Sequence, residues 1–221
     1  MADYGMIIKN SNSQIQIDSL YKNYALNQTG STVIADPGEP SPAQIDINDV
    51  SEAPIFVHKP VTTYYCTHWG FKKDGGNYTH SLMYVEEDQS LTLGWQVFIS
   101  GYVAILPTYG LIIKNPSNQI VFSSGDKYFK LRGIQSLNVP PATSADVTVV
   151  DADNNYFMLT NPSFRVIPQG APPAPRYCTL RGMLKINSTT IRINEFRFAT
   201  IGGSGYSINW IDDCILIEVG T

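Results

Sequence analysis

The sequence predicts an all-β protein built from two tandem β-sandwich-like domains, one a duplicate of the other, with negligible helix. Short runs of β-branched and aromatic residues alternate with turn residues along most of the 221-residue chain. No segment carries apolar residues at the 3.6-residue period of an amphipathic helix. A twelve-residue phrase, YGMIIKNSNSQI at 4–15, also recurs as YGLIIKNPSNQI at 109–120, with eight identical positions.

The repeated phrase predicts a β-hairpin. Its first copy holds β-branched runs at 6–8 and 15–17, and the second run alternates apolar and polar residues as a half-buried strand does. Asn and Ser suit the turn between them, because their side chains bond nearby backbone groups and Asn tolerates positive φ. We expect each half of the chain to begin with such a hairpin, whose turn fixes the strand register.

Further strands follow in the first half. The loop ADPGEPSP, at 35–42, precedes the alternating run AQIDINDV and the short apolar run APIFVHKP. A Gly75-Gly76 turn is expected to join a strand over 65–71 to another over 79–85. The run SLTLGWQVFISGYVAILP closes this half as strand, since its Gly and β-branched residues disfavour a helix.

The second half repeats these events in the same order. DKYFKL echoes KNYAL, ADVTVVDADNNYFMLTNP follows the layout of AQIDINDVSEAPIFVHKP, and RYCTLRGM answers YYCTHWGF. The spacing of matched positions grows from 105 residues at Tyr4 and Tyr109 to 112 at Cys66 and Cys178, so the second copy should carry extra loop residues. We expect a first β-sandwich domain at 1–106 and its duplicate at 107–221, with a single large barrel as the alternative.

Composition excludes several classes of protein. The net charge is −4 and 15% of residues are charged, against about 25% in typical soluble proteins, so nothing basic is available to neutralise phosphates. We expect no nucleic-acid partner and, without a run of ~20 apolar residues, no membrane span. The first residues lack the pattern of a signal peptide, which predicts synthesis and folding in a cytoplasm.

Metal and disulfide sites are not predicted. The three cysteines, Cys66, Cys178 and Cys214, form no C-x-x-C pair and are expected to be buried as small apolar side chains. The histidines lack ligand spacing and are expected to make ordinary hydrogen bonds; they are His58, His68 and His80. Three acidic groups could bind calcium if their loops converged, although solvated edges are the more common interpretation; they are Glu86 to Asp88, Asp151 with Asp153, and Asp212 with Asp213.

No catalytic pattern stands out. The chain has no P-loop, nucleophile elbow or dinucleotide fingerprint, and IGGSGYS at 201–207 is expected to be a flexible loop. Nothing indicates the acid and base of a glycosidase. We therefore expect no enzyme activity, no catalytic residue, no metal and no cofactor.

Four aromatic residues are the candidate contact residues: Tyr64, Tyr65, Trp69 and Tyr78. Aromatic side chains in loops stack on sugars in lectins, and they also occupy cores and protein interfaces. The second interpretation is favoured here.

The segment at 4–26, with a degenerate second match at 109–131, resembles the start of small β-rich virion proteins encoded among the tail genes of tailed bacteriophages. In those proteins a hairpin with an apolar-Asn-turn-Gln-apolar-Asp pattern begins the chain, and a Tyr-Ala-Leu segment follows. The resemblance implies a non-enzymatic structural protein of the tail tip, baseplate or fibre-attachment region. It also implies other tail proteins as partners and location in the virion after synthesis in the host cytoplasm.

The duplication adds an expectation about assembly. Tail tips are often three-fold and tail tubes six-fold, so a homotrimer of a doubled domain would present six similar surfaces around one axis. The low charge suits large buried interfaces. The alternative function is a carbohydrate- or receptor-binding module that recognises a host surface glycan, and a third is a hydrolase of surface polymers.

Overall fold

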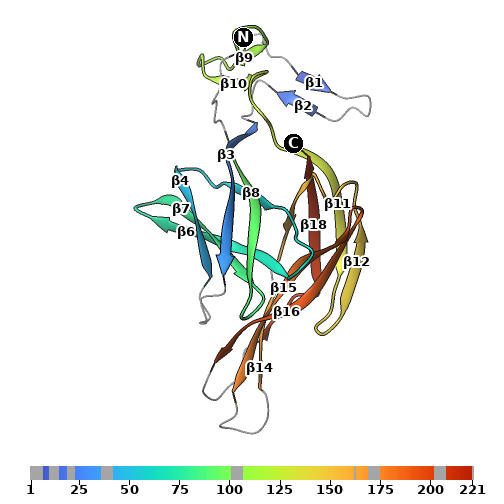
Figure 1. Cartoon of the computed structure of the whole chain (residues 1–221). Helices are drawn as coiled ribbons and strands as arrows, with labels where there is room; N and C mark the ends of the chain where they lie inside the picture. Colours follow the sequence, from blue (N-terminus) through green and yellow to red (C-terminus); the bar gives the residue numbers. More distant parts are fainter. Residues whose placement is uncertain are drawn as a thin grey trace.

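The structure is a computed structural model that describes residues 7–9, 15–18, 23–35, 42–100, 107–161, 163–168, 175–201 and 208–220. All eighteen regular elements in these ranges are β-strands, and most belong to two large antiparallel sheets (Figure 1). This confirms the predicted all-β fold class. No helix in the described ranges is long and apolar enough to cross a membrane.

The first sheet has six strands in the order β11-β18-β13-β5-β8-β3. Their bounds are Tyr24–Ala35 for β3, Ile55–His58 for β5, Ser90–Ser100 for β8, Lys130–Asn138 for β11, Tyr156–Leu159 for β13 and Asp213–Gly220 for β18.

The second sheet follows the order β12-β16-β15-β6-β7-β4, and β14 pairs with both β15 and β17. The bounds are Ala43–Val50 for β4, Cys66–Asp74 for β6, Asn77–Val85 for β7, Ser144–Thr148 for β12, Phe164–Pro168 for β14, Arg176–Asn187 for β15, Thr190–Ile201 for β16 and Ile208–Asn209 for β17.

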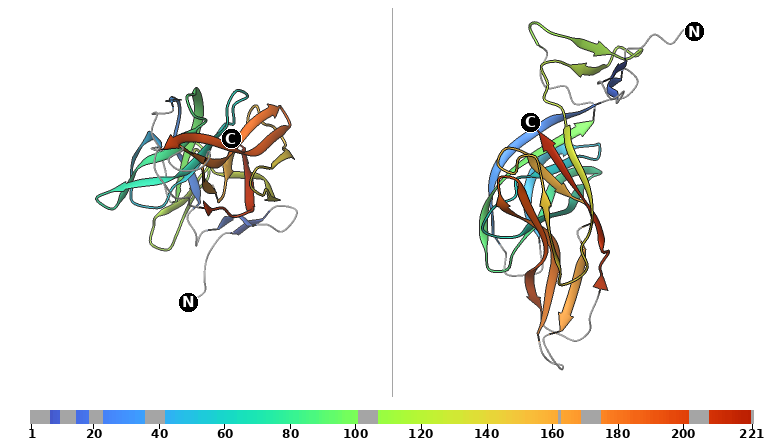
Figure 2. Two further views of the ribbon diagram at one scale, coloured as in Figure 1. Left: turned by 90° about the horizontal axis from the view of Figure 1, so that it is seen from below. Right: turned by 90° about the vertical axis from the view of Figure 1, so that its right-hand side faces the viewer.

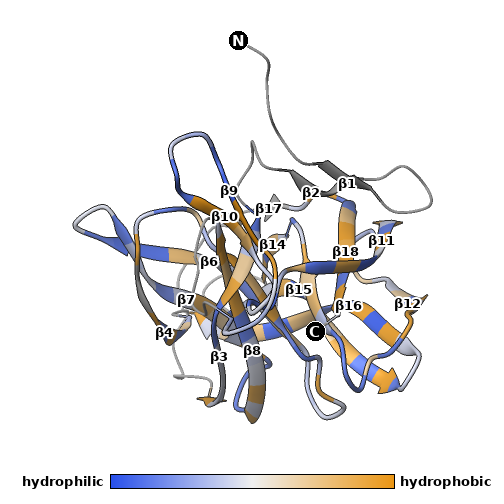
Figure 3. Cartoon of the chain, turned by 90° about the horizontal axis from the view of Figure 1, so that it is seen from above, coloured by the Kyte–Doolittle hydropathy of each residue, from blue (hydrophilic) through white to orange (hydrophobic). Residues whose placement is uncertain are grey.

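Two separate apolar cores lie in this sandwich, one in each half of the chain. Strands of both sheets contribute to each core: Phe56 of β5 and Met83 of β7 belong to the first, and Phe157 of β13 and Ile191 of β16 to the second. Alternation along the strands produces this arrangement, because successive side chains of a strand point to opposite faces. Hydrophobic and hydrophilic bands accordingly alternate along several strands in Figure 3.

The predicted hairpins form, and they share one register. In the first, β1 (Ile7–Lys9) pairs with β2 (Ile15–Asp18), and in the second, β9 (Ile112–Lys114) pairs with β10 (Ile120–Ser123). Each of the three residue pairs in one hairpin recurs 105 positions later in the other. Both hairpins lie beyond one end of the sandwich, opposite the end that carries β14 (Figures 1 and 2).

Turn chemistry follows the sequence in both predicted turns that the structure describes. Asn118 takes a φ of 62° between β9 and β10, and the side-chain oxygen of Asn115 accepts a hydrogen bond from the Gln119 amide at 2.9 Å. Gly75 and Gly76, at φ of 57° and 97°, join β6 to β7 as expected. Such positive φ values favour Asn and Gly.

The two halves contribute corresponding strands to both sheets. In the six-stranded sheet, the first half contributes β3, β8 and β5 from the edge to the middle, and the second half contributes β11, β18 and β13 from the opposite edge. In the second sheet, the corresponding strands are β4, β7 and β6 from the first half and β12, β16 and β15 from the second. A duplicated chain would produce this order. The duplication and the domain boundary between 106 and 107 nevertheless stay predictions, and both sheets continue across that boundary. The residues at 101–106 lie outside the described ranges.

In the described ranges, the inner strands that meet in the middle of each sheet share one residue pair, and a separate bridge near the hairpins links Ala25 of β3 to Tyr128. His58 of β5 pairs with Phe157 of β13, and Cys66 of β6 pairs with Met183 of β15. We call this junction the seam. On the outer face of the six-stranded sheet, Val57, Phe98 and Val219 pack in one cluster that crosses it.

The matched YCT phrases do not take equivalent places. Cys66 lies in the first core, whereas Cys178 lies in a different apolar cluster, described below. The register of β6 shifts between His68 and Gly70, so Trp69 is an extra residue there. A bulge of this kind reverses the faces to which the residues on one side of it point. All three cysteines are free and buried, as predicted.

Candidate functional site

A groove forms where β15 changes its neighbour. At Met183 β15 pairs with β6, and from Leu180 to Arg176 it pairs with β14 instead. Residues 176–180 of β15 therefore extend past the point where β15 contacts β6. A hollow is left between the strands β6 and β7 on one side and β14, β15 and β16 on the other. The hollow is a cavity of about 270 Å³.

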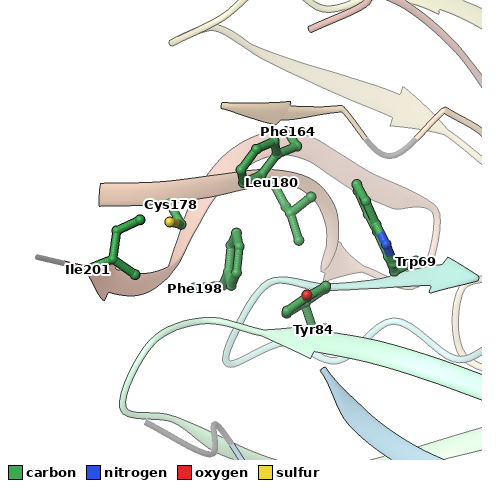
Figure 4. A pocket seen from close by; sticks show the side chains of 7 residues that line it. All are labelled: Trp69, Tyr84, Phe164, Cys178, Leu180, Phe198 and Ile201. Atoms are coloured by element: carbon green, nitrogen blue, oxygen red, sulfur yellow. The ribbon is translucent and has the colours of Figure 1, made fainter. Parts of the chain in front are cut away.

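Both halves of the chain line this groove. Its lining residues are Trp69 of β6, Tyr84 of β7, Phe164 of β14, Cys178 and Leu180 of β15, and Phe198 and Ile201 of β16 (Figure 4). Four of the seven are aromatic. The groove thus lies across the boundary between the halves and depends on their relative position.

The Trp69 ring meets two other aromatic rings of the groove edge to face. The Trp69 ring lies 6.0 Å from that of Tyr84 and 6.5 Å from that of Phe164, at interplanar angles of 82° and 70°. Tyr84 and Phe198 are closer, at 4.4 Å. Edge-to-face pairs are the favourable arrangement for such rings. Trp69 remains 40% exposed, so a ligand can reach it from solvent.

The groove is uncharged at neutral pH. Burial raises the pKa of the Tyr84 phenol and of the Cys178 thiol, so both stay protonated. The other lining side chains carry no ionisable group. This lining suits an aliphatic or aromatic group, or the C–H face of a sugar ring, better than a charged ligand.

An ion pair beside the groove ties the halves together. Glu87, in the turn after β7, pairs with Arg197 of β16, and it accepts a hydrogen bond from the Thr200 hydroxyl at 2.7 Å. The Glu87 amide also donates to the Arg197 carbonyl at 2.8 Å. Arg197 in turn lies over the Tyr177 ring, 4.0 Å from its centroid.

The four candidate aromatic residues do not form one site. Trp69 lines the groove, and Tyr65 packs against the same cluster, its ring 6.3 Å from that of Phe196. Tyr64 and Tyr78 pack against the first core instead. One of the four is therefore part of the groove and one is its neighbour.

Six lining residues were missed in the sequence because no local pattern unites them. Phe164, Cys178 and Phe198 come from three strands of the second half, and Tyr84 comes from the first. A strand pattern indicates which residues share a face, but it does not indicate which distant strand lies beside that face. The pairing switch of β15 is a tertiary event.

The acidic groups bond within the protein. One oxygen of Asp151 accepts hydrogen bonds from the amides of Asp153 and Asn154, and Asp153 pairs with Lys185 at 2.7 Å. In the described ranges, no three His, Cys, Asp or Glu side chains are grouped to hold a metal ion. Residues 202–207 of the Gly-rich loop lie outside the described ranges.

The histidines follow the prediction in part. His80 does bond as expected, to Thr79 at 2.8 Å and to Asp46 at 3.0 Å. The rings of His58 and His68 are buried, and each has a backbone hydrogen bond, with Lys59 and Gly70 respectively, but their Nε2 atoms have no hydrogen-bond partner among the described residues. The local sequence did not reveal this, because the burial follows from the packing of one sheet on the other.

No protein-family model, curated protein or solved structure matches this chain.

Proposed function

We propose that this protein is a non-enzymatic structural component of a bacteriophage tail, at the tail tip, baseplate or fibre-attachment region. It assembles with other tail proteins and as a homo-oligomer. The resemblance of residues 4–26 to tail-gene virion proteins motivates the proposal. The observation that carries it is the exposed apolar surface on the β9–β10 hairpin and on the neighbouring edge of the six-stranded sheet.

That surface has two parts. Near the hairpin, Tyr109 is 93% exposed, and Leu111 and Ile112 are exposed as well. On the edge strand β11, Leu131 and Ile134 are more than half exposed. Large apolar side chains gathered on a surface typically mark protein interfaces. An edge strand also offers backbone groups for pairing with another chain.

The hairpins bear on the symmetry of the assembly. Two hairpins of the same register lie at one end of the molecule (Figure 1). A homotrimer would therefore present six such hairpins around one axis, which suits a junction between three-fold and six-fold parts of a tail.

Polar substitutions on this surface are expected to abolish assembly while leaving the fold intact. A triple variant with Tyr109→Ser, Leu111→Ser and Ile134→Ser should be a monomer in mass photometry, whereas the natural chain forms oligomers. Because these side chains are solvent-exposed, the free energy of unfolding should change by only about 0.5 kcal/mol per site.

Val150→Ser is the matched control, because Val150 is 67% exposed but lies in the turn between β12 and β13. It should leave the oligomer unchanged. A natural chain that is strictly monomeric and absent from purified virions contradicts the proposal.

The second candidate function is recognition of a host-surface carbohydrate or receptor, and the exposed Trp69 at the groove favours it. Trp69→Ala should then weaken binding of the natural chain to host cells or to a glycan array roughly 10-fold, as loss of a stacking aromatic anchor does. Tyr78→Ala is the control, since Tyr78 lies outside the groove and should leave binding unchanged. Equal losses in both variants would exclude the groove as the binding site.

A further inference from the structure

A buried titratable cluster lies at the seam. His58 and Cys66 are themselves the residues of the first half that pair across it, one in each sheet. The Nδ1 atom of His58 lies 3.8 Å from the Cys66 sulfur. His58 is 1% exposed and Cys66 is fully buried.

Aromatic stacking connects His58 to His68. The Phe56 ring lies 6.4 Å from the ring of His58 and 4.8 Å from that of His68. His68 then meets Phe71 edge to face at 4.7 Å. Apart from one backbone hydrogen bond each, with Lys59 and Gly70, both imidazoles contact apolar surfaces, and their Nε2 atoms have no partner in the described part of the chain.

Among the described residues, none that pairs with this cluster carries a carboxylate that could neutralise a proton on these rings. The residues that pair with the cluster across β7, β8, β13 and β15 are uncharged: Met83, Val85, Trp95, Phe157 and Met183. Lys59, next to His58, directs its ammonium group to the Asp153 carbonyl, and Asp153 pairs with Lys185.

An acid on the neighbouring strand β18 is also engaged in hydrogen bonds. Glu218 of β18 pairs in register with Phe157, and its carboxylate accepts hydrogen bonds from the amides of Val150 and Asp151 at 2.9 Å each. It also accepts one from the Asn155 side chain at 2.6 Å. The titratable groups within the cluster itself are thus Cys66 and the two histidines.

We propose that the seam is an acid-sensitive joint, in which protonation of His58 and His68 separates β5 from β13 and β6 from β15. An imidazolium ion in this apolar cluster would have neither water nor a counter-ion, so the closed seam holds only the neutral rings. The two cores share no residue, so each stays packed away from the seam, whereas the side of the first core that carries His58, Phe56 and His68 becomes exposed to water. The groove has walls from both halves, so opening also alters the groove.

The direction of titration agrees with this geometry. Burial lowers the pKa of His58 to about 4, and burial together with the neighbouring His58 lowers that of His68 to about 3. Both pKa values lie below the 6.5 of a solvated histidine. Between pH 6.5 and 4, the rings are therefore protonated when they are exposed and neutral when they are buried. The closed seam is therefore fully stabilised above pH 6.5 and loses stability as the pH falls toward 4.

Hydrogen exchange of the full-length protein, corrected for intrinsic rates, tests the joint. Two protons taken up on opening predict a roughly 10³-fold loss of protection between pH 6.5 and 4.5 for the amides of the two seam pairs, His58 with Phe157 and Cys66 with Met183. Amides of the β3–β8 and β11–β18 pairs should retain their protection. If all these strands lose protection together, the protein simply unfolds in acid and the proposal fails.

Three variants locate the effect. His58→Leu suits its site, because Leu159 occupies the corresponding end of β13, and it should reduce the loss to roughly 50-fold, as expected for one proton. Adding His68→Gln should remove the pH dependence. His80→Gln, which removes the surface histidine, should behave as the natural chain does. An unchanged loss in the double variant overturns the proposal.

Proton NMR of the natural chain provides a check that needs no variant. The ring protons of His58 and His68 should show no titration between pH 8 and about 5 in the closed form. An imidazole of either residue that titrates near 6.5 in the folded protein contradicts the proposed joint.

Discussion

Arg181→Met is expected to lower the free energy of unfolding by about 2–3 kcal/mol, because it removes the charge-assisted hydrogen bonds of a buried guanidinium group. Arg181 is the largest fully buried side chain described, and its guanidinium donates to the carbonyls of Val139 at 2.8 Å, Ile211 at 2.7 Å and Asp212 at 3.1 Å. It also lies over the Trp210 ring, 4.9 Å from the centroid. These contacts hold the segments that precede β12 and β18. Methionine fills the volume but donates to none of these carbonyls. They keep only their second donors, which are the Trp210 ring, the Ser163 hydroxyl and the Val139 amide.

Urea denaturation of Arg181→Met and Arg192→Met side by side measures this difference. Arg192 forms a two-point pair with Asp146 on the surface of the second sheet, and such exposed pairs contribute only about 0–1 kcal/mol. Arg181→Lys should be intermediate, since an ammonium group supplies three donors but not the planar fork. Equal midpoints for Arg181→Met and Arg192→Met would show that the buried guanidinium contributes no more than a surface ion pair.

Gly182→Ala is the second substitution expected to have a large effect, with a loss of about 2–4 kcal/mol from overpacking. A Cβ atom at this position would lie 2.5 Å from the Phe196 ring and 2.9 Å from the Cys66 carbonyl oxygen. The ring can turn aside, but the carbonyl belongs to the backbone of β6. It can retreat only by loosening the pair between Cys66 and Met183, one of the two pairs that form the seam.

Gly70→Ala is the matched control for this substitution. Gly70 occupies the matching position of the first-half phrase, and a Cβ atom there would meet no atom within 4 Å. Its effect should stay within about 1 kcal/mol, as at other uncrowded sites. Thermal or urea unfolding compares the two variants directly, and a Gly70→Ala loss as large as that of Gly182→Ala would refute the close-approach explanation.

Much of the fold was predictable because it depends on local chemistry. The all-β class follows from strand-length apolar runs, and the turns follow from residues that accept positive φ, as at Asn118, Gly75 and Gly76. The doubled phrase predicted two hairpins, and these share one register. The candidate site was predicted poorly. Trp69 lies in the groove, whereas Tyr64 and Tyr78 pack against a core.

The sequence by itself determined the strands, the turns, the buried cysteines and the corresponding order of elements in the two halves. Only the tertiary structure decided that the halves share both sheets and that the groove lies where β15 exchanges β6 for β14. It also decided that the matching residues Cys66 and Cys178 lie in different apolar clusters, because a bulge at Trp69 shifts the register of β6. The physical reason is that alternation along a strand indicates which side chains share a face, whereas pairing partners depend on contacts between residues far apart in the chain.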